Sequence, residues 1–437
     1  MAAMNESARS GKASRFPGDA SGLDAEAFAR TLFDEVAALS PADEGVSRPA
    51  YSATETRVLE HLRERAEAWG LAVRPDRGGN YHFALPEDMD ADRFALVGSH
   101  VDSVHQGGNY DGLAGVAAGL LCLARARAAG ERFARPVRCI AMRAEESHWF
   151  GPCYIGSKGL TGQLTPTELA AAHRGDGRSL ERHMLDLGID VESVRAGRPL
   201  LDVASVLEYV ELHIEQGPML VEKRLPVAVV SGIRGNFRHR KITCLGEAGH
   251  SGAVPRAYRH DPVFALADLL SRLDDSWLTI LQKGDDLVLT SGVVSTDPLT
   301  NSLSRIPDKV TFSLDCRSQS RAALDGMRVL LREEMRQVER ARKVEFVLDD
   351  ELSTAPALMS PTVIEGLKAA MARTGLAPFV MPSGGGHDAA IFANAGVPAG
   401  MIFVRNRNGS HNPEEALDIA DFLMGADVLY NHLREEK

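Results

Sequence analysis

The chain has 437 residues, a length that predicts two to three domains with a sizeable hydrophobic core. Hydrophobic residues make up 44% and charged residues 25%, which is typical of a globular protein in solution. Sixty acidic against 49 basic residues give a formal net charge of −11, so we expect neither nucleic acid nor an anionic membrane as a partner.

The cysteines and the first residues indicate the compartment. The five cysteines are widely spaced and include no CxxC pair, which favours a reducing environment over a disulfide framework. The first thirty residues contain no continuous apolar run, and no later stretch reaches the ~18 apolar residues of a membrane helix. We therefore expect a cytoplasmic protein in which residues 1–20, rich in Ser, Gly and Ala, form a mobile tail.

From residue 23 onward, helical and strand patterns alternate. Apolar residues at three- and four-residue spacing predict helices over 23–39, 53–70 and 114–130. Short apolar runs predict strands, which cover residues 71–76, 80–85, 93–100, 136–144 and 204–214. This alternation predicts an α/β fold with helices packed on a sheet.

The pattern changes near residue 232. The next elements are a strand over 237–246, a helix over 261–275, strands over 286–295 and 309–318, a helix over 320–343 and a strand over 344–350. This β-α-β-β-α-β order predicts an inserted split-βαβ (ferredoxin-like) lid domain over residues 233–347. The first pattern then resumes, so we expect a discontinuous catalytic domain made of residues 21–232 and 348–437.

The densest polar cluster, residues 98–112, follows a predicted buried strand. His100 and Asp102 would project to the same side of an extended segment, so that His100 binds a metal while Asp102 accepts its other ring N–H. Asp111 lies between two glycines, which permit a tight path back to the same ion. An HxD motif alone is more often structural, so this interpretation depends on further ligands.

Further histidines and carboxylates follow other predicted strands. Glu145 and Glu146 would point to different faces, so that one binds metal while the other handles protons. Taken one at a time, these residues have ordinary structural explanations. The two carboxylates are typical of an acidic turn, His213 of the core and His411 of a surface loop. Together, five residues of metal-binding type at strand ends of one layer predict a metal site: His100, Asp111, Glu146, His213 and His411.

Eight motifs in order carry a family resemblance: GSHVDSV, GGNYDG, EES, ELHIEQGP, GEAGHSG, TNSLSRIPDKVTFSLDCRS, SGGGHDA and SHNPEE. From about residue 28 to the C-terminus, the chain resembles the dimetal amidohydrolases of the M20 peptidase group. The resemblance is to its hydantoinase/carbamoylase branch, which includes N-carbamoyl-L-amino acid hydrolases, β-ureidopropionase and allantoate amidohydrolase. It implies a mixed-sheet, metallo-aminopeptidase-like catalytic domain, a lid that also serves dimerisation, and a homodimer.

The resemblance also implies the role of each residue in the metal site. His100, Asp111 and His213 would hold one divalent ion, and Asp111, Glu146 and His411 the other. Glu145 would be the general base, and Asp102 would support His100. These ligand types suit Zn, Mn, Co and Ni alike.

A second group of residues would form the substrate pocket by the same resemblance. Gln216 would line it, His250 and Asn301 would stabilise the oxyanion, and Arg317 would clamp a substrate carboxylate. The lid residues would act within their own chain or in the site of the partner subunit. Gly385, inside SGGGHDA, lies either in a plain turn or where backbone N–H groups approach that carboxylate.

The implied reaction is hydrolysis of a C–N bond in a ureido, N-carbamoyl or amide group of a small carboxylate-bearing substrate, by a hydroxide that bridges the two ions. An aminoacylase, dipeptidase or amine-hydrolysing relative is the alternative, and a non-catalytic binding protein would be expected to lack Glu145. Three departures from the family pattern, at Trp149, Arg256 and Ser304, leave the substrate open.

Overall fold

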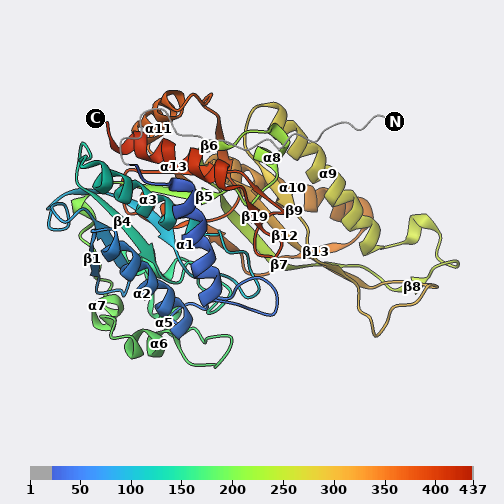
Figure 1. Cartoon of the computed structure of the whole chain (residues 1–437). Helices are drawn as coiled ribbons and strands as arrows, with labels where there is room; N and C mark the ends of the chain where they lie inside the picture. Colours follow the sequence, from blue (N-terminus) through green and yellow to red (C-terminus); the bar gives the residue numbers. More distant parts are fainter. Residues whose placement is uncertain (1–21, 436–437) are drawn as a thin grey trace, which may run out of the picture.

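The computed structural model describes residues 22–435, so the tail expected over residues 1–20 lies outside the described part of the chain. The described residues form two main sheets, one of nine strands and one of six. In Figure 1 the smaller sheet and its helices extend to one side of the larger body. The predicted α/β class with a mixed sheet is confirmed.

The nine-stranded sheet is parallel at its centre and antiparallel at its edges. Its strands follow in the order β1 (Ala72–Pro75), β2 (Tyr81–Ala84), β4 (Val137–Met142), β3 (Phe94–His100), β5 (Val206–Ile214), β17 (Ala399–Val404), β6 (Val227–Ile233) and β15 (Ala357–Leu358), and β16 (Val380–Ser383) also pairs with β6. β3 is parallel to β4 and β5, and β17 is parallel to β5. Four neighbouring strands, β4, β3, β5 and β17, therefore end at the same edge of the sheet.

Helices cover both faces of this sheet. One face carries α1 (Ala25–Leu39), α2 (Ala53–Ala68), α3 (Leu113–Ala129), α11 (Pro361–Arg373) and α13 (Ile419–Leu433). The other carries α4 (Ile155–Thr161), α5 (Pro166–Leu169), α6 (Leu180–Asp186), α7 (Val191–Arg195), α8 (Met219–Lys223) and α12 (Asp388–Asn394). Alternate residues of β3 enter the two cores, with Ala95 and Val97 in one and Phe94 and Leu96 in the other. A strand covered on both faces is apolar throughout, which explains the continuous apolar runs in the sequence.

The six-stranded sheet lies between residues 235 and 354 and is antiparallel. Its strands follow in the order β10 (Val294–Ser295), β12 (Lys309–Ser318), β7 (Gly235–Leu245) and β13 (Glu345–Val347), with β9 (Val288–Thr290) beside β12 and β14 (Leu352–Thr354) beside β7. α9 (Pro262–Gln282) and α10 (Arg321–Arg342) share its core. Along α10 the buried residues recur every three or four positions, from Leu324 to Val338. The domain bounds and the lid role of this unit stay predictions.

The remaining described strands form two small sheets. β8 (Gly249–His250) pairs with β11 (Arg305–Ile306), and β18 (Asn406–Arg407) pairs with β19 (Ala416–Leu417). Two 3₁₀ turns lie at η1 (Val203–Ser205) and η2 (Arg256–Tyr258). Figure 1 places β8 at the end of the six-stranded unit that is remote from β4 and β5. Within residues 22–435, no helix has the length and apolar character needed to cross a membrane.

Candidate metal centre

The predicted metal-site residues gather at one edge of the nine-stranded sheet. His100 is the last residue of β3, and His213 is the second-last residue of β5. β4 ends at Met142, so Glu145 and Glu146 lie in the following loop and not at the strand end itself. The parallel pairing of these strands brings side chains that are more than a hundred residues apart to one place.

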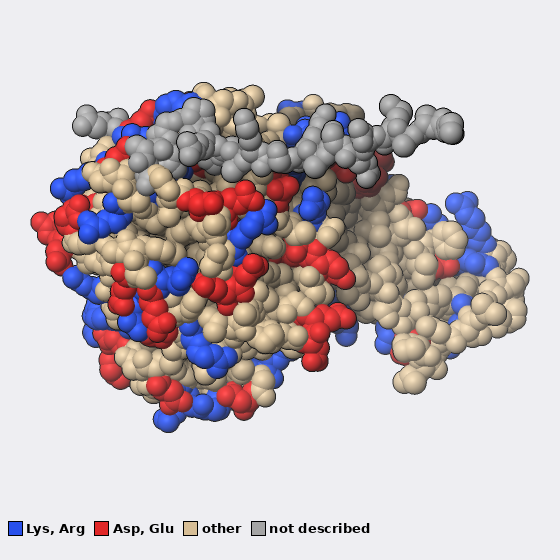
Figure 2. Space-filling view, viewed as in Figure 1, with Lys and Arg blue, Asp and Glu red and all other residues tan. Residues whose placement is uncertain are grey.

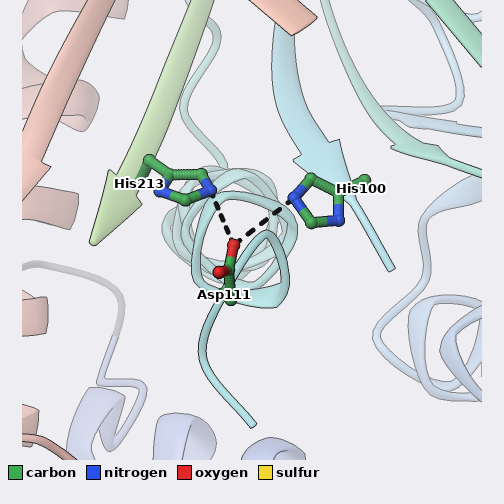
Figure 3. Close-up of side chains that lie close together, drawn as sticks. All are labelled: His100, Asp111 and His213. Atoms are coloured by element: carbon green, nitrogen blue, oxygen red, sulfur yellow. Dashed lines mark ion pairs between the residues drawn. The ribbon is translucent and has the colours of Figure 1, made fainter. Parts of the chain in front are cut away.

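Asp111 lies between the two buried histidines. Figure 3 shows the imidazoles of His100 and His213 both pointing toward its carboxylate. Asp111 Oδ1 is 3.5 Å from His100 Nε2 and 3.1 Å from His213 Nε2. Each ring is oriented from behind, since His100 Nδ1 lies 3.1 Å from the Asp102 carbonyl oxygen and His213 Nδ1 lies 2.8 Å from that of Ile214. Both Nε2 atoms therefore face the Asp111 carboxylate, and His213 Nε2 also accepts the backbone N–H of Gly112 at 3.3 Å.

Gly112 makes this arrangement sterically possible. Its φ is +67°, and a Cβ there would lie 2.4 Å from atoms of the His100 ring. Only glycine fits this position, which starts α3 directly behind Asp111. The neighbouring loop is held by Glu415, whose carboxylate accepts the backbone N–H groups of Tyr110 at 2.9 Å and Asp111 at 3.3 Å.

A second group shares Asp111. Its other oxygen, Oδ2, lies 3.4 Å from His411 Nε2, which is 3.1 Å from Glu146 Oε1. The His411 side chain is 51% exposed, whereas Asp111 and Glu146 are buried. The structure thus brings all five predicted ligands into two adjoining groups that meet at Asp111.

Asp102 supports both groups. One of its oxygens is 3.3 Å from His100 Nδ1 and accepts the backbone N–H of Glu145 at 2.9 Å, while the other accepts that of Glu146 at 3.0 Å. The sequence predicted only the first of these roles. A single buried carboxylate therefore orients a histidine and the loop that carries two further site residues.

Glu145 is buried beside these ligands. Burial raises the pKa of its carboxyl group well above the ordinary value, and the negative charges of Glu146 and Asp388 act in the same direction against the lowering effect of His100. A carboxyl group whose pKa is raised accepts a proton more readily than an ordinary one, which suits a general base.

Three residues beside the site have left-handed backbone conformations. The φ of Ala144 is +55°, that of Gln216 is +63° and that of His411 is +61°. Non-glycine residues rarely adopt this conformation, and the strain collects where side chains are held in set positions. This conformation therefore occurs directly before the candidate base Glu145, at the pocket residue Gln216 and at the candidate ligand His411.

The donor set fits divalent cations. The histidine and carboxylate atoms lie 3.1 to 3.5 Å apart, close to the separation of ligands that share one ion at bond lengths of about 2.0–2.2 Å. Burying this many carboxylates without compensating charge costs several kcal/mol per ion. Two divalent cations would offset that cost.

Of the predicted pocket residues, Gln216 and Gly385 lie at the site. The Gln216 side chain donates a hydrogen bond of 2.8 Å to Asp111 Oδ2, and the Ser410 hydroxyl donates one of 2.5 Å to the same oxygen. A Cβ at Gly385 would lie 2.8 Å from Gln216 Oε1, so a larger residue there would displace the Gln216 side chain.

Arg317 reaches this region from β12. It donates to the carbonyl oxygen of Gly384 at 2.9 Å, and two of its nitrogens bind the Asp315 carboxylate at 2.9 to 3.2 Å. The guanidinium predicted to clamp a substrate carboxylate is therefore held by a carboxylate of its own strand.

His250 and Asn301 are the predicted residues that the structure keeps apart from the metal-site cluster. Both are exposed; β8, which contains His250, lies far from the sheet edge in Figure 1, and Asn301 lies in the loop before β11, which pairs with β8. His250 Nδ1 accepts the N–H groups of Gly252 and Ala253 at 3.1 and 3.2 Å, which leaves its Nε2 to donate outward.

Several buried titratable residues were missed. Glu211 accepts the Ser99 hydroxyl at 2.6 Å, and His387 lies beside His213 with ring centroids 4.4 Å apart. Burial lowers the pKa of His387 well below its ordinary value, and it raises the pKa of both Asp388 and Glu415 to about 7. His387 and Asp388 lie in the GHDA motif and Glu415 lies in NPEE, so these motifs could have indicated all three. For Glu211 the only sequence signal is its place in β5, two residues before His213.

The three residues that depart from the family pattern, Trp149, Arg256 and Ser304, have different surroundings. Trp149 is buried and donates its indole N–H to the Ser103 carbonyl oxygen at 2.8 Å. Arg256 and Ser304 are exposed in the six-stranded unit, where the Ser304 carbonyl accepts the N–H of Ser251 at 2.8 Å.

Comparison with known proteins gives a consistent result. The model of Peptidase family M20/M25/M40 matches residues 84–435. The N-carbamoyl-L-amino acid amidohydrolase of Geobacillus stearothermophilus is 33% identical over 389 residues, which cover 89% of this chain and 92% of that protein. The allantoate amidohydrolase of Escherichia coli K12 is 32% identical over 386 residues, with coverages of 88% and 91%.

Solved structures agree. The hydantoinase/carbamoylase-family amidase of Burkholderia multivorans has a TM-score of 0.83 at 26% identity, covering 94% of this chain and 97% of its own. The predicted family and the predicted class of enzyme are both confirmed. The chain belongs to Peptidase family M20/M25/M40 and is a metal-dependent hydrolase of carbon–nitrogen bonds.

Proposed function

We propose that this enzyme hydrolyses the C–N bond of a ureido or N-carbamoyl group on a small carboxylate-bearing substrate, with two divalent ions bound at the sheet edge. The observation that carries the proposal is the pair of ligand groups that meet at Asp111 beside a buried carboxyl group, Glu145. The similarity to an N-carbamoyl-L-amino acid amidohydrolase and an allantoate amidohydrolase supports the substrate class.

The ligand assignment follows the two groups. His100, Asp111 and His213 would hold one ion, and Asp111, Glu146 and His411 the other. Zn, Mn, Co or Ni bound there would polarise the scissile carbonyl group and acidify the attacking water. The half-exposed His411 marks the side from which a substrate enters.

Glu145 carries the proton. Its carboxylate takes a proton from the attacking water and passes it to the leaving nitrogen, which departs as an amine or as ammonia. The raised pKa that burial gives Glu145 supports both halves of this transfer, since the protonated form must persist until the C–N bond breaks.

Arg317 binds the substrate carboxylate. A planar guanidinium matches a carboxylate with two parallel hydrogen bonds, and its contact with Gly384 brings Arg317 to the glycine run that includes Gly385. Gln216 lines the same side through its hydrogen bond to Asp111. The Asp315 side chain holds the guanidinium in place until the substrate arrives.

The active enzyme is a homodimer in which the partner subunit supplies His250 and Asn301. Both are exposed and remote from the metal-site cluster of their own chain. On the face seen in Figure 2, charged side chains are dense on the larger body and sparse on the six-stranded unit. α9 of that unit exposes Val263, Phe264, Leu278 and Leu281, which suits a subunit interface.

The enzyme works in the cytoplasm. All five cysteines lie within the described residues as free thiols, and four of them are buried. Thiols of this kind persist in a reducing compartment.

A turnover screen tests the proposed reaction. The metal-reconstituted enzyme is assayed against N-carbamoyl amino acids, ureidopropionate, allantoate, N-acyl amino acids and dipeptides, with chelated enzyme as the control. We expect turnover of a ureido or N-carbamoyl substrate. Turnover confined to N-acyl amino acids or dipeptides would show that the proposed substrate class is wrong. Full activity after exhaustive chelation would show that the reaction does not need the two proposed ions.

A further inference from the structure

A separate set of metal-binding side chains lies together outside the candidate metal centre. His173 and Asp176 belong to the loop between α5 and α6, and His183 belongs to α6. The neck of the loop is closed by an isolated β-bridge between Ala172 and Ser179. One donor atom from each of the three side chains lies within 4.8 Å of the others. This set, the loop cluster, shares no residue with the groups at the sheet edge.

The spacing within the loop cluster matches shared coordination. Asp176 Oδ1 is 3.3 Å from His173 Nδ1 and 3.2 Å from His183 Nε2. Ligand atoms around a tetrahedral ion with bonds of about 2.0–2.1 Å are about 3.3–3.4 Å apart. Two imidazoles and one carboxylate are a donor set that zinc and its neighbours bind well.

Aromatic residues hold both imidazoles in place. His173 stacks on Trp149 with ring centroids 5.7 Å apart and planes at 12°. His183 meets Phe150 edge-on at 5.3 Å. The two imidazole side chains are only 11% and 12% exposed. A cation would therefore meet ligands that have little conformational freedom left to lose.

The protonation of His173 leaves a lone pair facing Asp176. Its Nδ1 accepts the backbone N–H groups of Gly175 at 3.2 Å and Asp176 at 3.3 Å, so the proton of the neutral ring is assigned to Nε2. Within residues 22–435, this buried Nε2 has no hydrogen-bond partner. Burial and the adjacent His183 lower the pKa of His173, which favours the neutral form that binds metal.

A cation would improve this arrangement. A lone pair and a carboxylate oxygen 3.3 Å apart with no proton between them repel each other, and a cation between them turns both into ligands. The two amides that lose Nδ1 as acceptor lie in an exposed turn, where water replaces it. The nearby Arg178 and Arg182 are paired with Asp186, so their charges are partly compensated.

We propose that His173, Asp176 and His183 form an additional site for one divalent cation of the zinc type, independent of the ions at the sheet edge. The bound cation fastens the loop to α6, and both imidazoles pack against Trp149 and Phe150, which follow Glu146 in the chain by three and four residues. The loop is already tied there, since the N–H of Arg174 donates to the Trp149 carbonyl oxygen at 2.7 Å.

Zinc counting on the full chain tests this site. Metal-free protein is dialysed to equilibrium against Zn²⁺, and bound zinc per chain is measured for the unaltered protein and its variants. His183→Gln and Asp176→Asn should each hold one zinc fewer than the unaltered protein. Asp176→Asn keeps an oxygen to accept the N–H of Arg178, a hydrogen bond of 3.0 Å that shapes the turn, so its loss of zinc would reflect lost ligation.

His61→Gln is the matched control. His61 pairs with one carboxylate, that of Glu35, at 3.0 Å, and belongs to no three-ligand group among the described residues. It should keep the full zinc count. If Asp176→Asn binds as much zinc as the unaltered protein, the loop cluster is not a metal site. Should His183→Gln fail to fold, Asp176→Asn decides the question alone.

Discussion

The two main sheets are covered differently, and this difference separates the residues that meet within one chain from those that do not. Every residue of β3 is buried, because helices cover both faces of the nine-stranded sheet. Along β12 the burial alternates, because helices cover only one face of the six-stranded sheet. The doubly covered sheet holds the metal-site cluster with little freedom, while the unit built on the singly covered sheet carries His250 and Asn301 exposed at its surface.

We expect the largest effect from a substitution at Gly112, beside the metal-site cluster of the nine-stranded sheet. Gly112→Ala would drive a Cβ into the His100 ring, so we expect loss of bound metal and of all measurable activity. Gly130→Ala is the matched control, because Gly130 has a φ of +65° but open space around the added carbon. It should cost only about 1–2 kcal/mol of stability. Metal analysis and circular dichroism of both variants check this, and equal metal content would contradict the steric argument.

Glu145→Gln separates chemistry from metal binding at the same edge. We expect kcat to fall by roughly 10²–10⁴-fold with metal content unchanged, since a positioned base contributes about that factor. Glu146→Gln should lose metal, because Glu146 lies 3.1 Å from His411 within the second group. If the two variants showed the reverse pattern, the assignments of base and ligand would have to be exchanged.

Arg317→Lys tests the reach of the six-stranded sheet into the site. An ammonium cannot reproduce the two parallel bonds of a guanidinium, so we expect kcat/KM for carboxylated substrates to fall by roughly 10- to 100-fold. For the same substrates amidated at the carboxylate, kcat/KM should fall only slightly. Equal losses for acid and amide would remove Arg317 from carboxylate recognition.

Mixing two inactive variants tests whether His250 acts in the site of its own chain or in that of the partner subunit. Glu145→Ala lacks the proposed base, and His250→Ala lacks the proposed oxyanion donor. After subunit exchange about half of the dimers are mixed, and in each of these one site has both residues, so roughly a quarter of all sites should recover. Verified exchange without recovered activity would show that His250 serves its own chain.

Metal uptake should release protons from the second group. The carboxylates of Asp111 and Glu146 raise the pKa of His411 to about 10 in the metal-free protein, so His411 is protonated at pH 7. A metal must displace this proton, and apparent affinity should therefore rise as pH increases toward 10. Calorimetry in buffers of different ionisation enthalpy measures the release. Uptake without protons at pH 7 would contradict this view of His411.

The sequence predicted the nine-stranded region better than the six-stranded one for a physical reason. His100 and His213 stand in continuous apolar runs, and parallel strands must end together, so their meeting followed from local pattern alone. Glu415 and Glu211 act through contacts between distant segments, which no local pattern reports. The pairing of Arg317 with Asp315 was also missed, because the only partner expected for Arg317 was a substrate carboxylate.

Asp102 has a consequence for how this enzyme can change. Its carboxylate faces His100 and also accepts the backbone N–H groups of Glu145 and Glu146, so the proposed ligands and the proposed base are positioned by one side chain. A displacement of Asp102 would therefore move both His100 and the loop that carries Glu145 and Glu146. We therefore expect changes in substrate choice to arise at side chains outside this edge, such as Arg317 of β12 and His250 of β8.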